Sequence, residues 1–323
     1  MAIDEIVRVL PAEIRDAVNN LDIEYEKLQE IHLRVGRPLM LIYDNRELIL
    51  NRKNHSIKNK NSTGAGQTYI MNAEDLQESM EYISNYSMYA FEEELRQGFI
   101  TIQGGHRVGI AGKAVMQGNH VSGIRHVSFI NIRLSHQIRG CADDVMRYIA
   151  DKGKVFHTLI ISPPKCGKTT LLRDIIRQLS DGKRSYNGVP EREGKNIAVV
   201  DERSELGACY QGVPQNDLGI RTDVLDCCPK AEGMMMMIRS MSPDVIAVDE
   251  IGSKADMEAI HHAINCGCVI IATVHGSNMD DVRKKPILGQ LVTEKVFQRY
   301  IILTNEGHVG KVKEIFDERG NRQ

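Results

Sequence analysis

Hydrophobic residues recur with two different periods along the chain, and the change of period marks its organisation. Over residues 3–21 they fall at helical intervals with an interruption at Pro11, which predicts a helical start in two pieces. From residue 31 apolar and polar residues alternate, which indicates strands at residues 31–35, 39–43 and 48–50. A helical start followed by strands with short turns is typical of an α+β domain.

A long polar segment interrupts this first part of the chain. Residues 51–67 are rich in Lys, Asn, Ser and Gly, and we expect them to form a mobile surface loop. After it, the pattern predicts helices opening near Ala73 and at residues 91–96, a hairpin of strands at 99–102 and 108–115, and a closing strand at 127–134. We therefore expect a first domain at residues 1–137 and a connector helix within residues 138–156.

From residue 157 onward, apolar runs alternate with helical patterns. The expected strands lie at residues 159–161, 197–200, 244–250 and 268–274, and the expected helices at 168–179 and 254–265. Strands buried on both faces read as continuous apolar runs, and their alternation with helices is the signature of a parallel sheet covered on both sides. Residues 157–323 thus predict an α/β domain, to which residues 296–303 and 309–315 add edge strands before a polar tail.

A run of methionines, residues 234–237, lies between the second and third of these strands. Together with Met241 it has helical spacing. Because methionine fills irregular gaps in cores, this spacing predicts core packing rather than a partner surface.

Composition narrows the class of protein. The 323 residues suffice for about two domains, and the formal net charge of −2 gives no basic footprint, which argues against nucleic acid as a partner. Seven cysteines without metal-ligand spacing are typical of reduced thiols in a cytosolic protein. The first residues lack a signal-peptide pattern, and no apolar run is long enough to cross a membrane. We expect a cytoplasmic protein.

The main chemical motif is a strand, turn and helix at residues 159–172. It fits the phosphate-binding loop G-x-x-x-x-G-K-[ST], except that Ser162 replaces the first glycine and, through its Cβ, should start the loop slightly differently. In such loops backbone N–H groups surround the β-phosphate of ATP, while Lys168 would contact the β- and γ-phosphates and the Thr169 hydroxyl would bind Mg²⁺. The residues expected to hold ATP and Mg²⁺ are Pro163, Pro164, Lys165, Cys166, Gly167, Lys168, Thr169 and Thr170.

Two acids end the strand at residues 244–250. Four apolar residues followed by Asp249 and Glu250 form the pattern called Walker B. Asp249 would hold the water shell of Mg²⁺, and Glu250 would orient and deprotonate the water that attacks the γ-phosphate. The alternative is that these acids cap the next helix, since Gly252 and Ser253 follow them.

Two further strand ends contribute polar residues. The strand at residues 197–200 ends in Asp201-Glu202-Arg203-Ser204-Glu205, at the edge where open α/β sheets carry their chemistry. The strand at 268–274 ends at His275, which we interpret as a γ-phosphate sensor because Glu250 already supplies the water-activating carboxylate. We expect three strand tips to converge on one triphosphate: the loop with Lys168 and Thr169, the acid pair, and the imidazole of His275.

The order of these motifs resembles that of the motor ATPases of type II and type IV secretion and of type IV pili. Those proteins carry a Walker A motif, an Asp box, a Walker B motif and a His box on a RecA-like domain behind a smaller N-terminal domain. The chain resembles still more closely the stage III sporulation protein AA family of endospore-forming bacteria, along nearly its whole length. The segments that carry this similarity are residues 104–109, 162–170, 201–205, 221–225 and 243–252.

The resemblance implies a RecA-like P-loop ATPase that works as a hexameric ring. It implies that the ring powers or helps assemble the channel complex between mother cell and forespore, and that membrane proteins of this complex hold it at the membrane. Catalytic roles are implied for Glu250, Glu202 and His275, with Glu205 as a further acid of the Asp box. Because the chain reads Asp201-Glu202 where the motors usually read Glu-Asp, the choice within that pair stays open. Such rings also use an arginine from the neighbouring subunit, and the candidates are Arg203, Arg221, Arg133 and Arg107.

Two other functions stay open on the sequence alone. One is a RecA-like ATPase that binds nucleic acid, although we expect no appended single-strand-binding module after the last strand. The other is a structural ring subunit that binds nucleotide without useful turnover, against which the intact Asp249-Glu250 pair argues.

Overall fold

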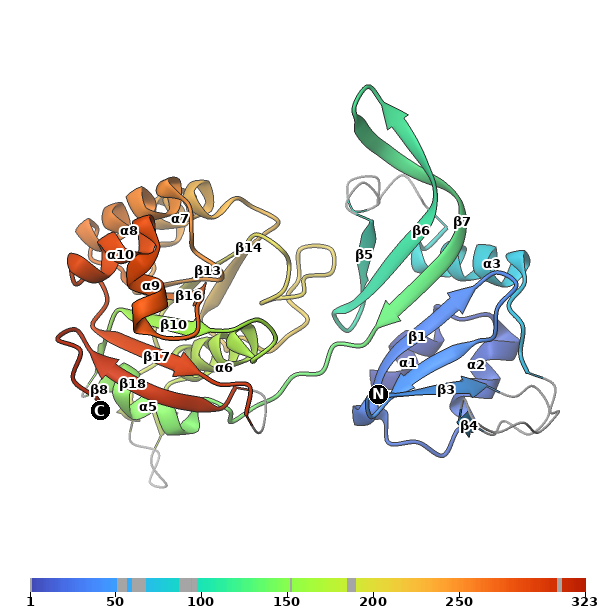
Figure 1. Ribbon diagram of the computed structural model, residues 1–323, viewed down its shortest axis with the longest axis horizontal. Helices are drawn as coiled ribbons and strands as arrows, with labels where there is room; N and C mark the ends of the chain where they lie inside the picture. The colour runs from blue at the N-terminus through green and yellow to red at the C-terminus, as the bar shows by residue number, and fades with distance from the viewer. Residues whose placement is uncertain are drawn as a thin grey trace. The chain divides into compact units, whose positions relative to one another are not determined.

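The computed structural model describes residues 2–50, 57–59, 68–86, 94, 98–151, 153–184, 190–306 and 310–323. The chain divides into two compact units, Met1–His136 and Gln137–Gln323 (Figure 1). An antiparallel sheet forms the first unit and a mainly parallel sheet the second. This confirms the predicted fold class, an α/β unit preceded by a smaller α+β unit.

The first unit contains three α-helices and seven strands among its described elements. They are α1 (Ala2–Val7), α2 (Ala12–Asn19), β1 (Leu28–Arg34), β2 (Met40–Tyr43), β3 (Arg46–Leu50), β4 (Ile57–Asn59), α3 (Ala73–Ile83), β5 (Phe99–Ile102), β6 (His106–Gln117) and β7 (His120–Arg133), with a short 3₁₀ helix at Tyr25–Lys27. The strand order is β4-β3-β2-β1-β7-β6-β5, and each pair of neighbours is antiparallel.

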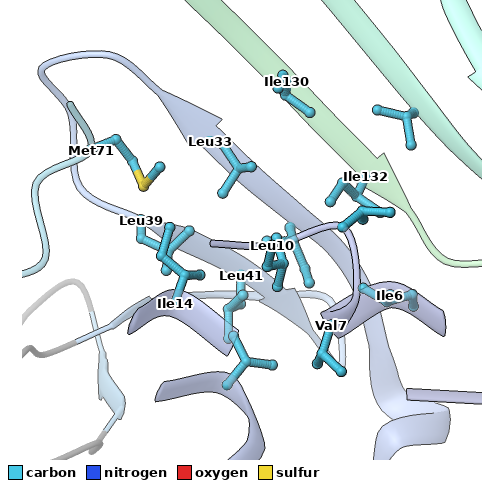
Figure 2. Close-up of a cluster of buried hydrophobic side chains, with 14 of the residues drawn as sticks. Ile6, Val7, Leu10, Ile14, Leu33, Leu39, Leu41, Met71, Ile130 and Ile132 are labelled. Atoms are coloured by element: carbon cyan, nitrogen blue, oxygen red, sulfur yellow. The ribbon is translucent and has the colours of Figure 1, made fainter. Parts of the chain in front are cut away.

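The core of this unit lies between α1 and α2 and one face of the sheet (Figure 2). Ile6, Leu10 and Ile14, three of the residues at helical spacing, are fully buried. They belong to one cluster with Leu33 of β1. Pro11 directly precedes α2 with a φ of −53°. The same proline therefore ends the first helical segment and leads into the second. Truncating one of these buried side chains to alanine would cost about 2–5 kcal/mol.

Part of the expected surface loop and one expected helix lie outside the described residues. Within residues 51–67 the structure describes only β4, which pairs with β3. The helix expected at 91–96 falls outside the described residues except for residue 94. The hairpin and closing strand are present as β5, β6 and β7, and β6 and β7 are longer than their apolar patterns indicated.

The extra length of β6 and β7 forms a two-stranded ribbon that runs on past the sheet (Figure 1). The strand register shifts between Ala111 and Lys113, opposite His126, whose φ is 49°. A Cβ on Gly112 would lie 2.6 Å from the backbone oxygen of His126. The bulge therefore needs glycine at this position, and such bulges bend and re-aim a strand. We call residues 113–125 the ribbon.

The second unit is built from these elements: α5 (Asp143–Ile149), β8 (Ala150–Asp151), β9 (Lys154–Val155), β10 (Thr158–Ser162), α6 (Lys168–Asp181), β11 (Lys183–Arg184), β12 (Pro190–Arg192), β13 (Ile197–Asp201), β14 (Thr222–Asp226), α7 (Lys230–Met241), β15 (Val245–Val248), α8 (Lys254–Asn265), β16 (Val269–His275), α9 (Met279–Lys284), α10 (Pro286–Thr293), β17 (Arg299–Leu303) and β18 (Val312–Asp317). Its sheet has the order β14-β13-β15-β16-β10-β17-β18. All neighbours are parallel except β17 and β18.

Helices cover both faces of this sheet. Ile160 of β10 packs into a core with α5 and α6, whereas its neighbours Leu159 and Ile161 belong to a core with α7, α8 and α10. All five residues of β10 are buried. Because a buried strand has no solvent side, its continuous apolar run is the expected sequence.

Several elements differ from the sequence-based expectations. The segment expected as a connector contains the short helix α5 followed by the β8–β9 hairpin, and α5 contributes buried residues to the core of the second unit. The half-buried edge strand β14 has no strong apolar pattern and was not predicted. Of the methionines in α7, Met234 and Met237 are buried as expected, whereas Met236 and Met241 are about half exposed, at 48% each. No helix among the described residues has the length and apolarity that a membrane crossing needs.

Candidate active site

The loop between β10 and α6 has the backbone geometry of a phosphate-binding loop. Lys165 and Gly167 have left-handed φ values of 62° and 88°, and Gly167 is the N-cap of α6. Ser162, by contrast, is absent from the positive-φ residues and donates its hydroxyl to the Pro163 carbonyl at 2.7 Å. Position 162 therefore accommodates a Cβ, which explains why serine can replace glycine here.

The loop brings two side chains of α6 to the end of β15. The Thr169 hydroxyl donates to Asp249 Oδ2 at 2.7 Å, and the Lys168 ammonium forms an ion pair with Glu250. Lys168 Nζ also lies 3.9 Å from Asp249 Oδ1. Lys168 is only 9% exposed, so its charge depends on these carboxylates for compensation.

Glu250 is the centre of the site. Besides Lys168 it contacts Arg203 Nη1 at 2.7 Å and His275 Nε2 at 2.9 Å. Burial by itself raises the pKa of Glu250, but Lys168, Arg203 and His275 outweigh it and hold the pKa below its ordinary value. The Glu250 carboxylate is therefore ionised at neutral pH.

Thr273 of β16 fixes both acids. Its hydroxyl donates to Asp249 and accepts the Glu250 backbone N–H at 2.9 Å. Glu250 has a left-handed φ of 56°. Residues other than glycine keep this strained backbone conformation only when the surrounding structure holds them in it. Thr273 was not predicted as a site residue, although a hydroxyl within an otherwise apolar strand is a visible signal.

The sequence left open that Asp249 and Glu250 cap the helix that follows them, and the start of α8 excludes this alternative. The N-cap of α8 is Ser253, which forms a capping box with Asp256. Ser253 Oγ accepts the Asp256 N–H at 3.0 Å, and Asp256 Oδ2 accepts the Ser253 N–H at 2.9 Å. Asp249 and Glu250 are therefore not the cap of this helix.

His275 lies at the tip of β16, which pairs with both β15 and β10. Its ring contacts Glu250 and is about half exposed, with 46% of the side chain accessible. The next residue, Gly276, donates its N–H to the Ser162 carbonyl at 3.1 Å, which ties the two strand tips together. His275 and Glu250 thus face the same place as Lys168, as expected.

The acidic segment after β13 folds back as a fixed loop. Asp201 is 2% exposed and accepts the N–H groups of Glu205, Leu206 and Gly207 at 2.8–2.9 Å. Burial raises its pKa to about 6, because it outweighs these hydrogen bonds. From α6 the buried Arg173 donates to the carbonyls of Glu205 at 2.7 Å and Leu206 at 3.1 Å. Arg173 was not predicted either, although an arginine within the apolar stretch of a helix is unusual.

The structure places the remaining predicted residues in different surroundings. Glu202 forms an ion pair with Lys230 at the start of α7 and does not contact the Glu250 cluster in any recorded interaction. Arg221 donates to the Ser180 carbonyl at 2.9 Å. In the first unit, Arg133 Nε lies 3.7 Å from Glu30, and the Arg107 guanidinium stacks 4.1 Å from the Phe99 ring centroid. Of the four candidate arginines, Arg203 is the one recorded in contact with Glu250.

The donor atoms at this site suit Mg²⁺ bound together with phosphates. A threonine hydroxyl and a carboxylate lie side by side at Thr169 and Asp249. Mg²⁺ takes hard oxygen ligands and is usually held by one or two carboxylates together with water and substrate phosphates. Within the described residues no group of three or more His, Cys, Asp or Glu side chains is placed to hold a metal ion.

The chain is similar to known proteins along nearly its whole length. The model of the family described as "Sporulation stage III, protein AA" matches residues 2–323. The chain is 40% identical over 319 residues to stage III sporulation protein AA of Bacillus subtilis (strain 168), covering 98% of this chain and 96% of that protein.

Solved structures of ATPases share the fold. The Legionella pneumophila ATPase DotB matches with a TM-score of 0.55 and 15% identity, covering 95% of this chain and 79% of that one. The pilus retraction motor PilT, solved with bound ADP, matches with the same TM-score and identity, covering 92% of this chain and 77% of that one. At such identities the likeness shows the fold alone.

Proposed function

This chain belongs to the sporulation stage III protein AA family, and from that premise we propose that it is a Mg²⁺-dependent P-loop ATPase of the secretion-motor type. The single observation that supports this most is the convergence of four side chains from three separate segments of the chain on Glu250 and its neighbour Asp249. Lys168, Arg203 and His275 contact Glu250, and Thr169 contacts Asp249.

Binding of ATP would use the loop and α6. The N–H groups of the loop and the first turn of α6 suit an anion, because a helix N-terminus presents unpaired donors and a positive dipole end. Lys168 would exchange its carboxylate partner for the β- and γ-phosphates. Thr169 and Asp249 would hold Mg²⁺ with its water shell, and the ion would neutralise charge on the phosphates.

Hydrolysis would proceed by in-line attack of water on the γ-phosphorus. An oxygen–phosphorus bond forms to the water oxygen, the bond to the β-phosphate oxygen breaks, and the water proton passes to the Glu250 carboxylate before release to solvent, giving ADP and phosphate. Glu250 would orient the water, with Thr273 holding its backbone and His275 lying beside the γ-phosphate as sensor. Most of the acceleration would come from positioning and charge, as in other phosphoryl transfers.

We further propose the cellular role that the family name suggests. The protein would work as a ring, most simply a hexamer, on the cytoplasmic side of the mother-cell membrane. There it would power or assemble the channel complex that links mother cell and forespore, held in place by membrane proteins of that complex. The sporulation name of the Bacillus subtilis relative and the fold shared with the ATPase DotB and the pilus retraction motor PilT support this proposal.

The test is phosphate release measured beside nucleotide binding. Glu250→Gln should bind ATP about as well as the wild type but lose turnover by roughly 10²-fold or more, because the amide cannot accept the proton. Lys168→Ala should weaken both binding and turnover. A matched control is Glu258→Gln, which removes an exposed carboxylate of α8 whose recorded partner is Lys254 and should leave both unchanged.

Two outcomes would contradict the proposal. Normal turnover by Glu250→Gln would show that the assigned base is wrong. A wild-type chain that binds ATP and releases no phosphate, alone or with its membrane partners, would favour a structural nucleotide-binding subunit instead.

A further inference from the structure

The β6–β7 hairpin of the first unit carries positively charged side chains and no negatively charged ones. Residues 106–133 contain four Lys or Arg residues and not one Asp or Glu, in a chain whose formal net charge is −2. Within the ribbon, Lys113 and Arg125 are both exposed and are direct cross-strand partners. Like charges directly opposite each other destabilise a strand pair. The ribbon therefore holds a local positive charge that its own strands do not neutralise.

The tip of the ribbon is apolar. Met116 and Val121 are cross-strand partners and are 56% and 42% exposed. From the bulge at Gly112 the strands pair only with each other and reach roughly 20 Å beyond the sheet at about 3.4 Å per residue. An isolated two-stranded hairpin is marginally stable in water, so a projecting ribbon with an apolar tip gains stability when a partner covers it.

The same unit has an acidic helix beside an apolar groove, which together complement the basic ribbon and its apolar tip. Helix α3 has the sequence AEDLQESMEYI, with four acidic residues and no basic one. Between α3 and β7 lies a groove of about 530 Å³. Its apolar lining includes Leu76, Met80 and Val127, and Glu81 of α3 lies on its wall. We call this the α3 groove.

We infer that the ribbon of one copy of this protein docks in the α3 groove of a second copy. The charges are complementary, because Lys113 and Arg125 would face the acids of α3. The apolar tip, Met116 and Val121, would cover the apolar floor of the groove. This contact lies wholly in the first unit and uses none of the residues assigned to ATP.

A chain does not fill its own groove with its own tip. His126, Val127 and Ser128 line the α3 groove and directly follow the ribbon in β7, whereas the tip lies at the far end of the ribbon. A ribbon tip that fills this groove would therefore come from another molecule. Because the ribbon and the groove are different surfaces, each copy donates one and receives the other, and such head-to-tail contacts close into rings or extend into filaments.

The experiment reverses the charges on each surface of the full-length chain and measures particle mass over a range of concentrations. The ribbon variant carries Lys113→Glu and Arg125→Glu, and the groove variant carries Glu74→Lys and Glu81→Lys. Each alone should weaken self-association by about tenfold or more, since like charges then face each other. A matched control, Arg8→Glu with Arg46→Glu, reverses two exposed charges of the same unit outside both surfaces and should associate like the wild type.

Rescue makes the test specific. Mixing the ribbon variant with the groove variant should restore mixed assemblies, because each acidic ribbon then meets a basic groove and each basic ribbon an acidic one. Far-ultraviolet circular dichroism and thermal melting of each variant show that the fold is kept. The ATPase rate is recorded separately, so a chain without turnover that still assembles in this pattern contradicts the proposed function and leaves this inference intact.

Other results would overturn the inference. They are a wild-type chain that stays monomeric throughout, charge-reversed variants that associate normally, or a mixture that shows no rescue. A ribbon variant that assembles normally but loses binding to anionic phospholipid vesicles or to single-stranded DNA would reassign the ribbon to that partner.

Discussion

The Thr273 hydroxyl accepts the backbone N–H of Glu250 at 2.9 Å and so holds a left-handed residue at the end of β15. The same hydroxyl donates to Asp249, so one side chain positions both acids of the site. Because Thr273 is fully buried, these two contacts replace any that water could provide.

We predict that Thr273→Val lowers kcat about tenfold or more with a smaller change in KM. Valine keeps the shape of threonine but leaves the Glu250 N–H and an Asp249 oxygen without this partner, which costs roughly 1–3 kcal/mol for a buried group. Thr273→Ser keeps the hydroxyl and should recover most of the turnover. Steady-state phosphate release checks both variants, and equal rates for valine and serine would remove Thr273 from this positioning role.

We predict that Arg203 acts within its own subunit. Its guanidinium lies 2.7 Å from Glu250 of the same chain, although a ring ATPase of this kind was expected to use an arginine from its neighbour. Arg203→Ala and Glu250→Gln should each lose activity, and mixed assemblies of the two should stay inactive, because every site then lacks one of the two groups. Recovery of phosphate release on mixing would instead show that Arg203 serves the adjacent subunit.

We predict a rise in stability of the first unit as the pH rises from about 4 to about 6.5, from His106. This histidine is 1% exposed and accepts the Ser135 N–H at 3.0 Å, and burial lowers its pKa to about 4. Between these two pH values His106 is protonated in the unfolded chain but neutral in the folded chain. The free energy of unfolding is therefore highest above the ordinary histidine pKa of about 6.5. It falls by roughly 3 kcal/mol as the pH falls toward 4.

The matched variant is His106→Asn, whose amide oxygen can accept the same N–H without titrating. Urea unfolding followed between pH 4 and pH 7 should show a smaller pH dependence for this variant than for the wild type. An unchanged slope would assign the acid sensitivity to other groups.

We predict that Asp201 gives the second unit the opposite pH dependence of stability. Its pKa is raised to about 6 in the folded chain, so the folded state binds the proton more tightly than the unfolded state. Its contribution is fully present below pH 4 and is lost as the pH rises through about 6, by roughly 2–3 kcal/mol. The advantage of the wild type over Asp201→Asn in urea unfolding should therefore shrink over this range. A constant difference would contradict the raised pKa.

The sequence predicted the parts of the site that lie on strongly patterned elements. The apolar runs of β10, β15 and β16 end directly at the loop, at Asp249 and Glu250, and at His275, so parallel pairing alone brings them to one edge. The fold class followed from the same alternation of runs and helices. The convergence of Lys168, Glu250 and His275 at one place was expected on these grounds, whereas the direct contacts of Glu250 with the other two were not predicted.

The remaining parts depend on contacts that no local pattern encodes. Glu202 and Arg203 are neighbours in a polar loop, and only the tertiary fold decides that Arg203 meets Glu250 while Glu202 meets Lys230. β14 has a half-buried, mixed sequence, so its place at the sheet edge depends on pairing with β13 rather than on its own pattern.

The two hydrogen bonds from Arg173 to the loop after β13 join the phosphate-facing helix to the acidic segment. A helix is stiff along its axis, and a buried guanidinium with two carbonyl partners resists separation. Because Arg173 and Lys168 belong to the same helix, we expect a shift of α6 on nucleotide binding to move the backbone of Glu205 and Leu206 with it.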